Sequence, residues 1–121
     1  MKVEFHIKDV VLTSKQKSLI EKKLFKLKRY LKDEPMTIDV YLKDETSVEK
    51  GGVDQAVELS VVFGQEKIFV REVDDRILRA FAYAYRALER NLERFHRKRI
   101  EVSHGHESRL DKILKRVGIR R

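Results

Sequence analysis

The sequence predicts a single α+β domain in which a four-stranded mixed sheet carries two helices packed on one face. Three observations lead to this prediction. Strand-like alternation of polar and apolar residues occurs four times, helix-like apolar spacing occurs twice before residue 100, and the order of these segments is β-α-β-β-β-α. The length of 121 residues suits one domain with one core. A right-handed crossover should make the first two strands parallel, and hairpins should make the other pairs antiparallel.

The first strand and the first helix are predicted within residues 2–32. Polar and apolar residues alternate over residues 2–8, which is typical of a strand with one apolar face. Thr13 or Ser14 can cap the helix that follows. The helix has one apolar stripe at spacings of four, three and four, formed by Ile20, Leu24, Leu27 and Leu31. Pro35 follows and helps to end the helix.

Three further strands are predicted between residues 38 and 71. The alternating apolar residues are Ile38, Val40 and Leu42 in the second strand and Val57, Leu59, Val61 and Phe63 in the third. The polar stretch 44–53 contains two glycines and is typical of a hairpin loop. Gly64 and Gln65 form a candidate tight turn. The fourth strand has Ile68 and Val70 on one face and Lys67, Phe69 and Arg71 on the other.

The second helix is predicted over residues 75–99. Asp74 or Asp75 can cap its start, where a negative charge also suits the helix dipole. No proline or glycine interrupts this stretch, and its apolar residues recur at spacings of three and four: Leu78, Phe81, Tyr85, Leu88, Leu92 and Phe95.

The remaining residues, 100–121, differ in character. Ser108 and Asp111 have the spacing of a capping box, and they precede a short amphipathic stretch that Gly118 could end. We therefore divide the chain into an α/β domain over residues 1–99 and a basic C-terminal tail over residues 100–121 that contains a short amphipathic helix.

The composition favours an acidic partner. Charged residues make up 40% of the chain, against a usual share of about 25%, and the formal net charge is +8. Such a balance suits nucleic acid or an anionic membrane surface. The chain has no cysteine, no apolar run long enough to cross a bilayer and no signal-peptide pattern, so we expect a cytoplasmic protein.

The strongest functional signal is a basic stripe on the second helix. Spacings of four, three, four, four and three should place six residues on one face: Arg79, Tyr83, Arg86, Arg90, Arg94 and Arg97. Five neighbouring guanidinium groups repel one another, and a polyanion along the helix would relieve the repulsion and release its own counterions. The planar guanidinium donates two hydrogen bonds to a phosphate at once. Tyr83 could stack on an exposed base.

The first helix shows the same bias. Lys22, Lys26 and Arg29 should share one face, with Lys23 beside them. Two adjacent basic helices favour a continuous RNA-binding surface. The alternative is an ordinary solvated face, in which Glu89 and Glu93 pair with arginines of their own helix.

Catalytic and metal sites lack support in the sequence. No phosphate loop, nucleophile elbow or zinc-protease motif occurs, so we predict no enzyme and no catalytic residues. His104 and His106, with His96 upstream, lack a further ligand at a reliable spacing. We therefore predict no metal and no cofactor, and we interpret His6 as a surface residue.

Three stretches of the chain resemble the ribosome hibernation promoting factor and ribosome-associated inhibitor family. The first runs from Leu12 to Tyr30 and is similar to the family's lysine-rich first helix with its K-L-x-K-L core. The second, Asp74 to Phe81, is similar to its D-D-M-Y-x-A-I helix opening. The third and most specific, Leu88 to Arg94, is similar to K-L-E-R-Q-L-x-K. The resemblance spans about residues 1 to 99.

The resemblance implies a function. Family members lie in the groove between the head and the body of the small ribosomal subunit, where they cover the messenger RNA channel and the transfer RNA sites. They stop translation and preserve idle ribosomes under stress. The residues that match the family's motif positions, and that the resemblance therefore implies as RNA contacts, are Lys23, Lys26, Arg29, Arg90 and Arg94.

It also implies the partners. We expect the small ribosomal subunit as partner through ribosomal RNA, no membrane, no small-molecule substrate, and a monomer when ribosome-bound. About 22 residues follow Arg99, too few for the second domain of long-form relatives, so the chain resembles a short form or a truncated long form. A generic double-stranded RNA-binding module and a protein-interaction module are the alternatives.

Overall fold

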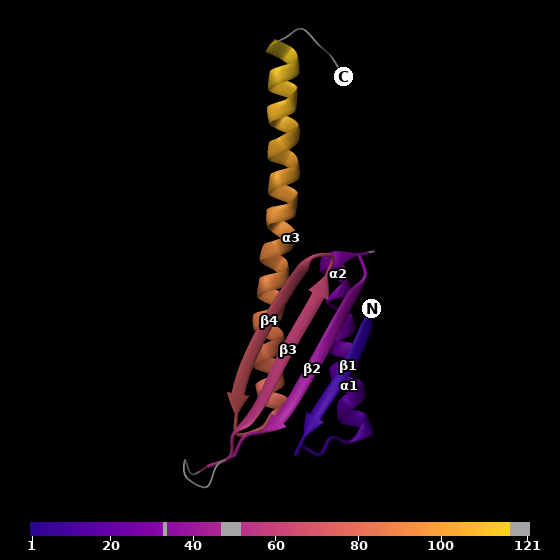
Figure 1. The fold of residues 1–121 in the computed structure, drawn as a ribbon, viewed down its shortest axis with the longest axis vertical. Helices are drawn as coiled ribbons and strands as arrows, with labels where there is room; N and C mark the ends of the chain where they lie inside the picture. The colour runs from indigo at the N-terminus through magenta and orange to yellow at the C-terminus, as the bar shows by residue number, and fades with distance from the viewer. Residues whose placement is uncertain (33, 47–51, 117–121) are drawn as a thin grey trace.

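The chain folds into a four-stranded sheet with its helices on one side, as the sequence predicted (Figure 1). The computed structural model describes the backbone of residues 1–32, 34–46 and 52–116, and the side chains of those up to residue 99. Its elements are β1 (Lys2–Lys8), α1 (Ser14–Phe25), α2 (Lys28–Leu31), β2 (Met36–Asp44), β3 (Gln55–Phe63), β4 (Glu66–Asp74) and α3 (Ile77–Arg116). No helix among the described residues is long and apolar enough to cross a membrane.

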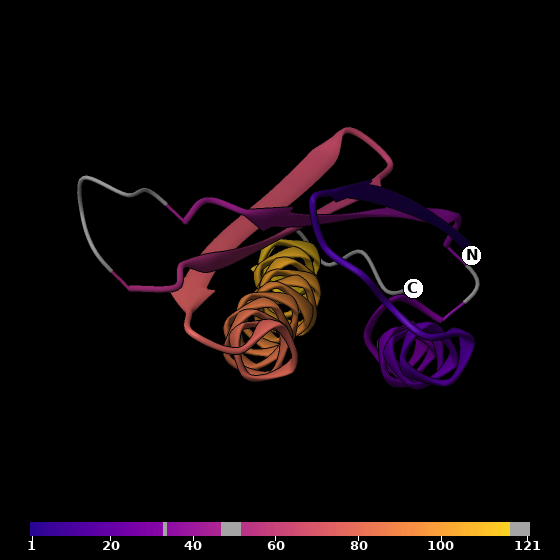
Figure 2. The same cartoon turned by 90° about the horizontal axis from the view of Figure 1, so that it is seen from below.

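The sheet has the predicted topology. Its strands follow the order β1-β2-β3-β4, with β1 parallel to β2 and the other two pairs antiparallel. Seen along the strands, α1 and α3 lie side by side beneath one face of the sheet and leave the other face open (Figure 2). The core lies between these layers. Side chains with no exposed area come from β2, β3 and the helices, among them Ile38, Val40, Leu42, Leu59, Leu24 and Leu88.

The first helical segment is capped as predicted but is divided in two. Thr13 is the N-cap, and its hydroxyl and the Gln16 side chain form a reciprocal capping box. The backbone tightens at Lys26 and Leu27, whose N–H groups donate to the carbonyls three residues earlier. The predicted stripe stays buried across this junction. Lys32, with φ of 45°, ends α2.

The turns on either side of β4 match the sequence reasoning. Gly64, with φ of 56°, forms the tight turn between β3 and β4, a conformation that favours glycine. At the other end, Asp74 Oδ1 accepts a hydrogen bond from the backbone N–H of Arg76 just before α3 begins. The predicted hairpin loop between β2 and β3 includes residues 47–51, which lie outside the described residues.

The buried stripe of α3 differs from the prediction at its start. Leu78 is 37% exposed, whereas Ala80 and Ala84 are fully buried. The helix packs against β3 and β4, and small side chains on the contact line allow a close approach that the larger Leu78 does not share. The other predicted stripe residues are buried or partly buried against the core.

The predicted end of the second helix near Arg99 is wrong. Residues Ile77–Arg116 form one helix of 40 residues, which extends beyond the sheet (Figure 1). The capping box at Ser108 therefore does not open a separate helix. No proline interrupts this stretch, and a single interior glycine, here Gly105, costs only about 1 kcal/mol relative to alanine. The predicted end at Gly118 lies outside the described residues.

Candidate nucleic-acid interface

The six predicted stripe residues of α3 are all exposed: Arg79, Tyr83, Arg86, Arg90, Arg94 and Arg97. They lie on the side of α3 that does not pack on the sheet, because the apolar stripe holds the other side against β3 and β4. Among the described side chains, four of the five arginines have no ion pair or hydrogen bond: Arg86, Arg90, Arg94 and Arg97. Unneutralised guanidinium groups in this arrangement suit a row of phosphates.

Arg79 is the exception in the stripe. Its Nε lies 2.8 Å from Asp74 Oδ1, and its Nη2 lies 2.6 Å from Asp75 Oδ1. Hydrogen bonds with Asp75 and with Arg79 lower the pKa of Asp74 to about 2. Two carboxylates therefore neutralise Arg79, and the unpaired positive charge of the stripe begins at Arg86.

The predicted basic residues of the first helical segment are exposed as well. They are Lys22, Lys23, Lys26 and Arg29. Two contacts join this segment to α3: the Lys23 ammonium lies 5.4 Å from the centroid of the Tyr85 ring, and Arg29 Nη2 lies 2.6 Å from Glu89 Oε2. The basic residues of both helical segments are therefore exposed on helices that lie on the same side of the sheet (Figure 2).

The alternative interpretation, in which Glu89 pairs with arginines of its own helix, is not what the described side chains show. Glu89 instead accepts hydrogen bonds from Arg29 on α2 and, at 3.5 Å, from the hydroxyl of Tyr85. Burial and the neighbouring Glu89 carboxylate raise the pKa of Tyr85 to about 12. Within the part of the chain whose side chains are described, Glu93 forms no ion pair. Among the side chains that the structure describes, Glu89 and Glu93 therefore do not neutralise the arginines of α3.

A shallow hollow, which no pattern in the sequence predicted, lies where α3 meets β4. It measures about 570 Å³ and is lined by Glu72, Tyr83, Arg86, Glu89 and Arg90. Its volume lies within the range of about 300–1,000 Å³ of small-molecule sites. A base could stack on the phenol ring of Tyr83 while Arg86 and Arg90 hold its phosphates and a carboxylate accepts from an exocyclic amino group.

His6 is exposed, as the sequence predicted, but its acidic neighbours were not apparent from the sequence. His96 is partly buried, and the side chains of His104 and His106 lie outside those described. His6 forms a cluster with Glu4 and Asp39 in which three potential ligand atoms lie within 4.8 Å of one another. The alternation in β1 places Glu4 and His6 on one face, but only the strand pairing brings Asp39 to them.

Comparison with known proteins decides the family. The model of the family described as Sigma 54 modulation protein / S30EA ribosomal protein matches residues 3–100. The chain belongs to this family. The resemblance inferred from the three sequence stretches is thus confirmed, and the family is one of ribosome-associated proteins. Comparison with curated protein sequences finds no significant match.

Two solved structures share the fold. The N-terminal domain of Thermus thermophilus Protein Y is 26% identical, with a TM-score of 0.65 over 78% of this chain and 99% of that chain. A ribosomal subunit interface protein from Coxiella burnetii is 16% identical, with a TM-score of 0.64 over 78% of this chain and 97% of that one. The predicted single α+β domain is confirmed by the first of these and by the observed sheet.

Proposed function

We propose that this S30EA-family chain binds the small ribosomal subunit through ribosomal RNA, blocks the messenger RNA and transfer RNA sites, and so inhibits translation and preserves idle ribosomes under stress. The observation that carries the proposal is the row of four exposed arginines on α3, which have no partner among the described side chains, together with the exposed lysines of the first helical segment. Family membership supports the ribosome as the source of the RNA.

The proposed contact residues come from both helical segments. On the first they are Lys22, Lys23, Lys26 and Arg29, and on α3 they are Arg79, Tyr83, Arg86, Arg90, Arg94 and Arg97. Arg86 and Arg90 stand at the centre because they line the hollow with Tyr83 and are unpaired within the described side chains. Arg79 contributes least, since Asp74 and Asp75 already neutralise it.

The surface supports a binding role with no catalytic step. The proposed contact residues with a charge are arginines and lysines, which are protonated at neutral pH and serve poorly as general bases. We therefore propose a stoichiometric inhibitor, whose domain over residues 1–99 binds the ribosome as a monomer and whose basic segment over residues 100–121 is an accessory to it.

Co-sedimentation with purified small ribosomal subunits across a salt series tests the proposal. We expect saturable one-to-one binding whose affinity falls steeply with salt, because each phosphate contact releases counterions. Messenger RNA or transfer RNA bound to the subunit should compete. An absence of binding at low salt would contradict the proposal, and binding without competition would contradict the blocking of these sites.

A further inference from the structure

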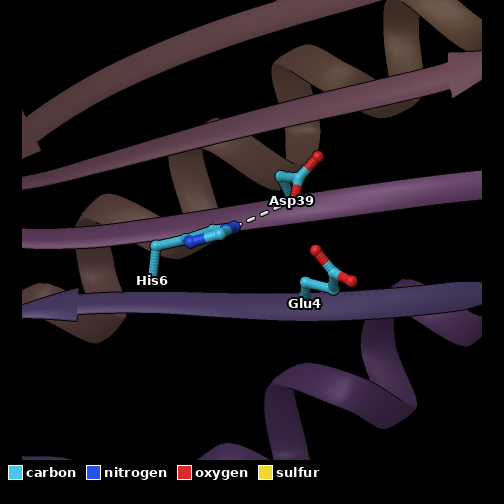
Figure 3. Close-up of side chains that lie close together, drawn as sticks. All are labelled: Glu4, His6 and Asp39. Atoms are coloured by element: carbon cyan, nitrogen blue, oxygen red, sulfur yellow. Dashed lines mark hydrogen bonds and ion pairs between the residues drawn. The ribbon is translucent and has the colours of Figure 1, made fainter.

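A cluster of three potential metal ligands lies on the open face of the sheet, away from both helices. Glu4 and His6 are two residues apart on β1, so both side chains emerge on the face opposite that of Phe5, which packs partly buried against the core. Parallel pairing places Asp39 of β2 directly beside Glu4. Carboxylate oxygens of Glu4 and Asp39 and a ring nitrogen of His6 all lie within 4.8 Å of one another (Figure 3).

The orientation of His6 is set by its neighbours. Its ring stacks on the Tyr41 ring at 4.5 Å between centroids and 14° between planes. In this position Nε2 lies 2.9 Å from Asp39 Oδ1, and the carboxyl group of Glu4 projects toward the same point (Figure 3). The cluster is therefore arranged before any ion arrives, which lowers the entropy that binding must overcome.

The geometry suits the replacement of a proton by a metal ion. Because a carboxylate only accepts, the hydrogen bond between His6 and Asp39 requires a proton on Nε2. Two ligands about 2.1 Å from one tetrahedral ion lie about 3.4 Å apart, roughly 0.5 Å more than the 2.9 Å between these two atoms. A cation can therefore take the place of this proton with little movement of either side chain.

The group that competes with an ion is Lys2. Its Nζ lies 2.9 Å from Glu4 Oε1, and the two side chains are 72% and 44% exposed. Ion pairs this exposed contribute little to stability, so the transfer of Glu4 from Lys2 to a metal costs little. Charge favours the exchange, since a divalent cation compensates both carboxylates at once.

We propose that Glu4, His6 and Asp39 form a binding site for a divalent transition-metal ion, with Zn²⁺ as the best fit. One imidazole nitrogen and two carboxylate oxygens match the preferences of Zn²⁺, whereas Mg²⁺ and Ca²⁺ favour oxygen alone. Three protein ligands leave a coordination position for water or for a group from a partner. The bound ion would tie the edge strand β1 to β2. This site lies on the face opposite the RNA surface and is independent of the proposed function.

Calorimetric titration of the full chain with Zn²⁺, prepared without a histidine tag, tests the site. We expect saturable binding of one equivalent. His6→Gln and Asp39→Asn should each weaken it by at least about tenfold, by analogy with the effect of losing metal-site partners. Lys2→Ala should strengthen it, because the competing ammonium is gone. The matched control replaces the other three histidines, His96, His104 and His106, by Gln and should leave the Kd unchanged.

Two results would overturn the proposal. One is the absence of saturable binding below about 1 mM Zn²⁺, which corresponds to only about 4 kcal/mol of binding free energy. The other is binding that survives His6→Gln and disappears in the control variant, which would place the metal at the other histidines. The imidazole nitrogen resonances of the unmodified chain provide a readout free of folding effects: Zn²⁺ must shift those of His6 before those of the other histidines.

Discussion

Removal of the central arginines should abolish tight RNA binding and leave the fold intact. We consider the triple variant Arg86→Ala, Arg90→Ala, Arg94→Ala. None of these exposed side chains has an ion pair among the described residues, so the free energy of unfolding should change by less than about 0.5 kcal/mol. Alanine is also the best helix former, which offsets any lost packing.

The effect on binding follows from the number of contacts. If each arginine forms one phosphate contact worth about 1 kcal/mol, the upper range for an exposed ion pair, the three together contribute about 3 kcal/mol. The Kd for the small ribosomal subunit should then rise roughly a hundredfold. The slope of log K against log salt should become shallower by about 2 to 3, since each contact accounts for about 0.7 to 0.9.

The assay combines subunit co-sedimentation across a salt series with chemical denaturation. A matched control replaces Lys8, Lys43 and Lys67, three exposed lysines on the open face of the sheet, by Ala. Both variants lower the formal net charge by three, from +8 to +5. An equal loss of affinity in the control would refute the assignment to α3, because total charge would then explain binding. A loss of stability above about 2 kcal/mol in the arginine variant would show that the stripe is structural.

Three further outcomes test the fold and its electrostatics. Leu88→Ala should destabilise the chain by about 2–5 kcal/mol in chemical denaturation, because Leu88 has no exposed area; a loss below about 1 kcal/mol would contradict the packing of α3 on the sheet. Thr13→Ala should cost about 1 kcal/mol through loss of the capping box, and Thr13→Ser, which keeps the hydroxyl, should not. The lowered pKa of Asp74, about 2 in the folded state, means that its contribution to stability is complete above the unfolded value near 3.8 and is lost as the pH falls toward 2. Asp74→Asn should therefore flatten the dependence of the melting temperature on pH in this window, and an unchanged dependence would show that other carboxyl groups cause it.

Local patterns predicted the elements well because each pattern reports a local constraint. The alternation in β2 and β3 requires only that one face of a strand be buried, and every residue that the alternation picked out is buried. The alternation did not predict the burial of Met36, Ala56 and Ser60. The buried residues at the start of α3 were harder to predict. Periodicity predicts that Leu78 is buried and does not pick out Ala80 and Ala84. Which of these residues is buried depends on how closely the helix approaches β3 and β4.

Contacts between distant segments explain what the sequence did not predict about the candidate sites. Arg29 and Glu89 are sixty residues apart, and their pairing engages Glu89 outside its own helix, which helical spacing alone does not suggest. His6 and Asp39 are separated by thirty-three residues and meet only through the parallel register of β1 and β2. Neither pair has a spacing that a periodic pattern could reveal.

The sequence alone therefore determined the order of elements, the basic exposed face of each helix and the family resemblance, because these depend on short-range periodicity, charge and motifs. The tertiary structure decided which charges remain unpaired, where the hollow beside Tyr83 lies, and that Glu4, His6 and Asp39 converge. Each of these depends on which segments pack side by side. That arrangement is set by burial of the whole core and not by the residues of the sites themselves.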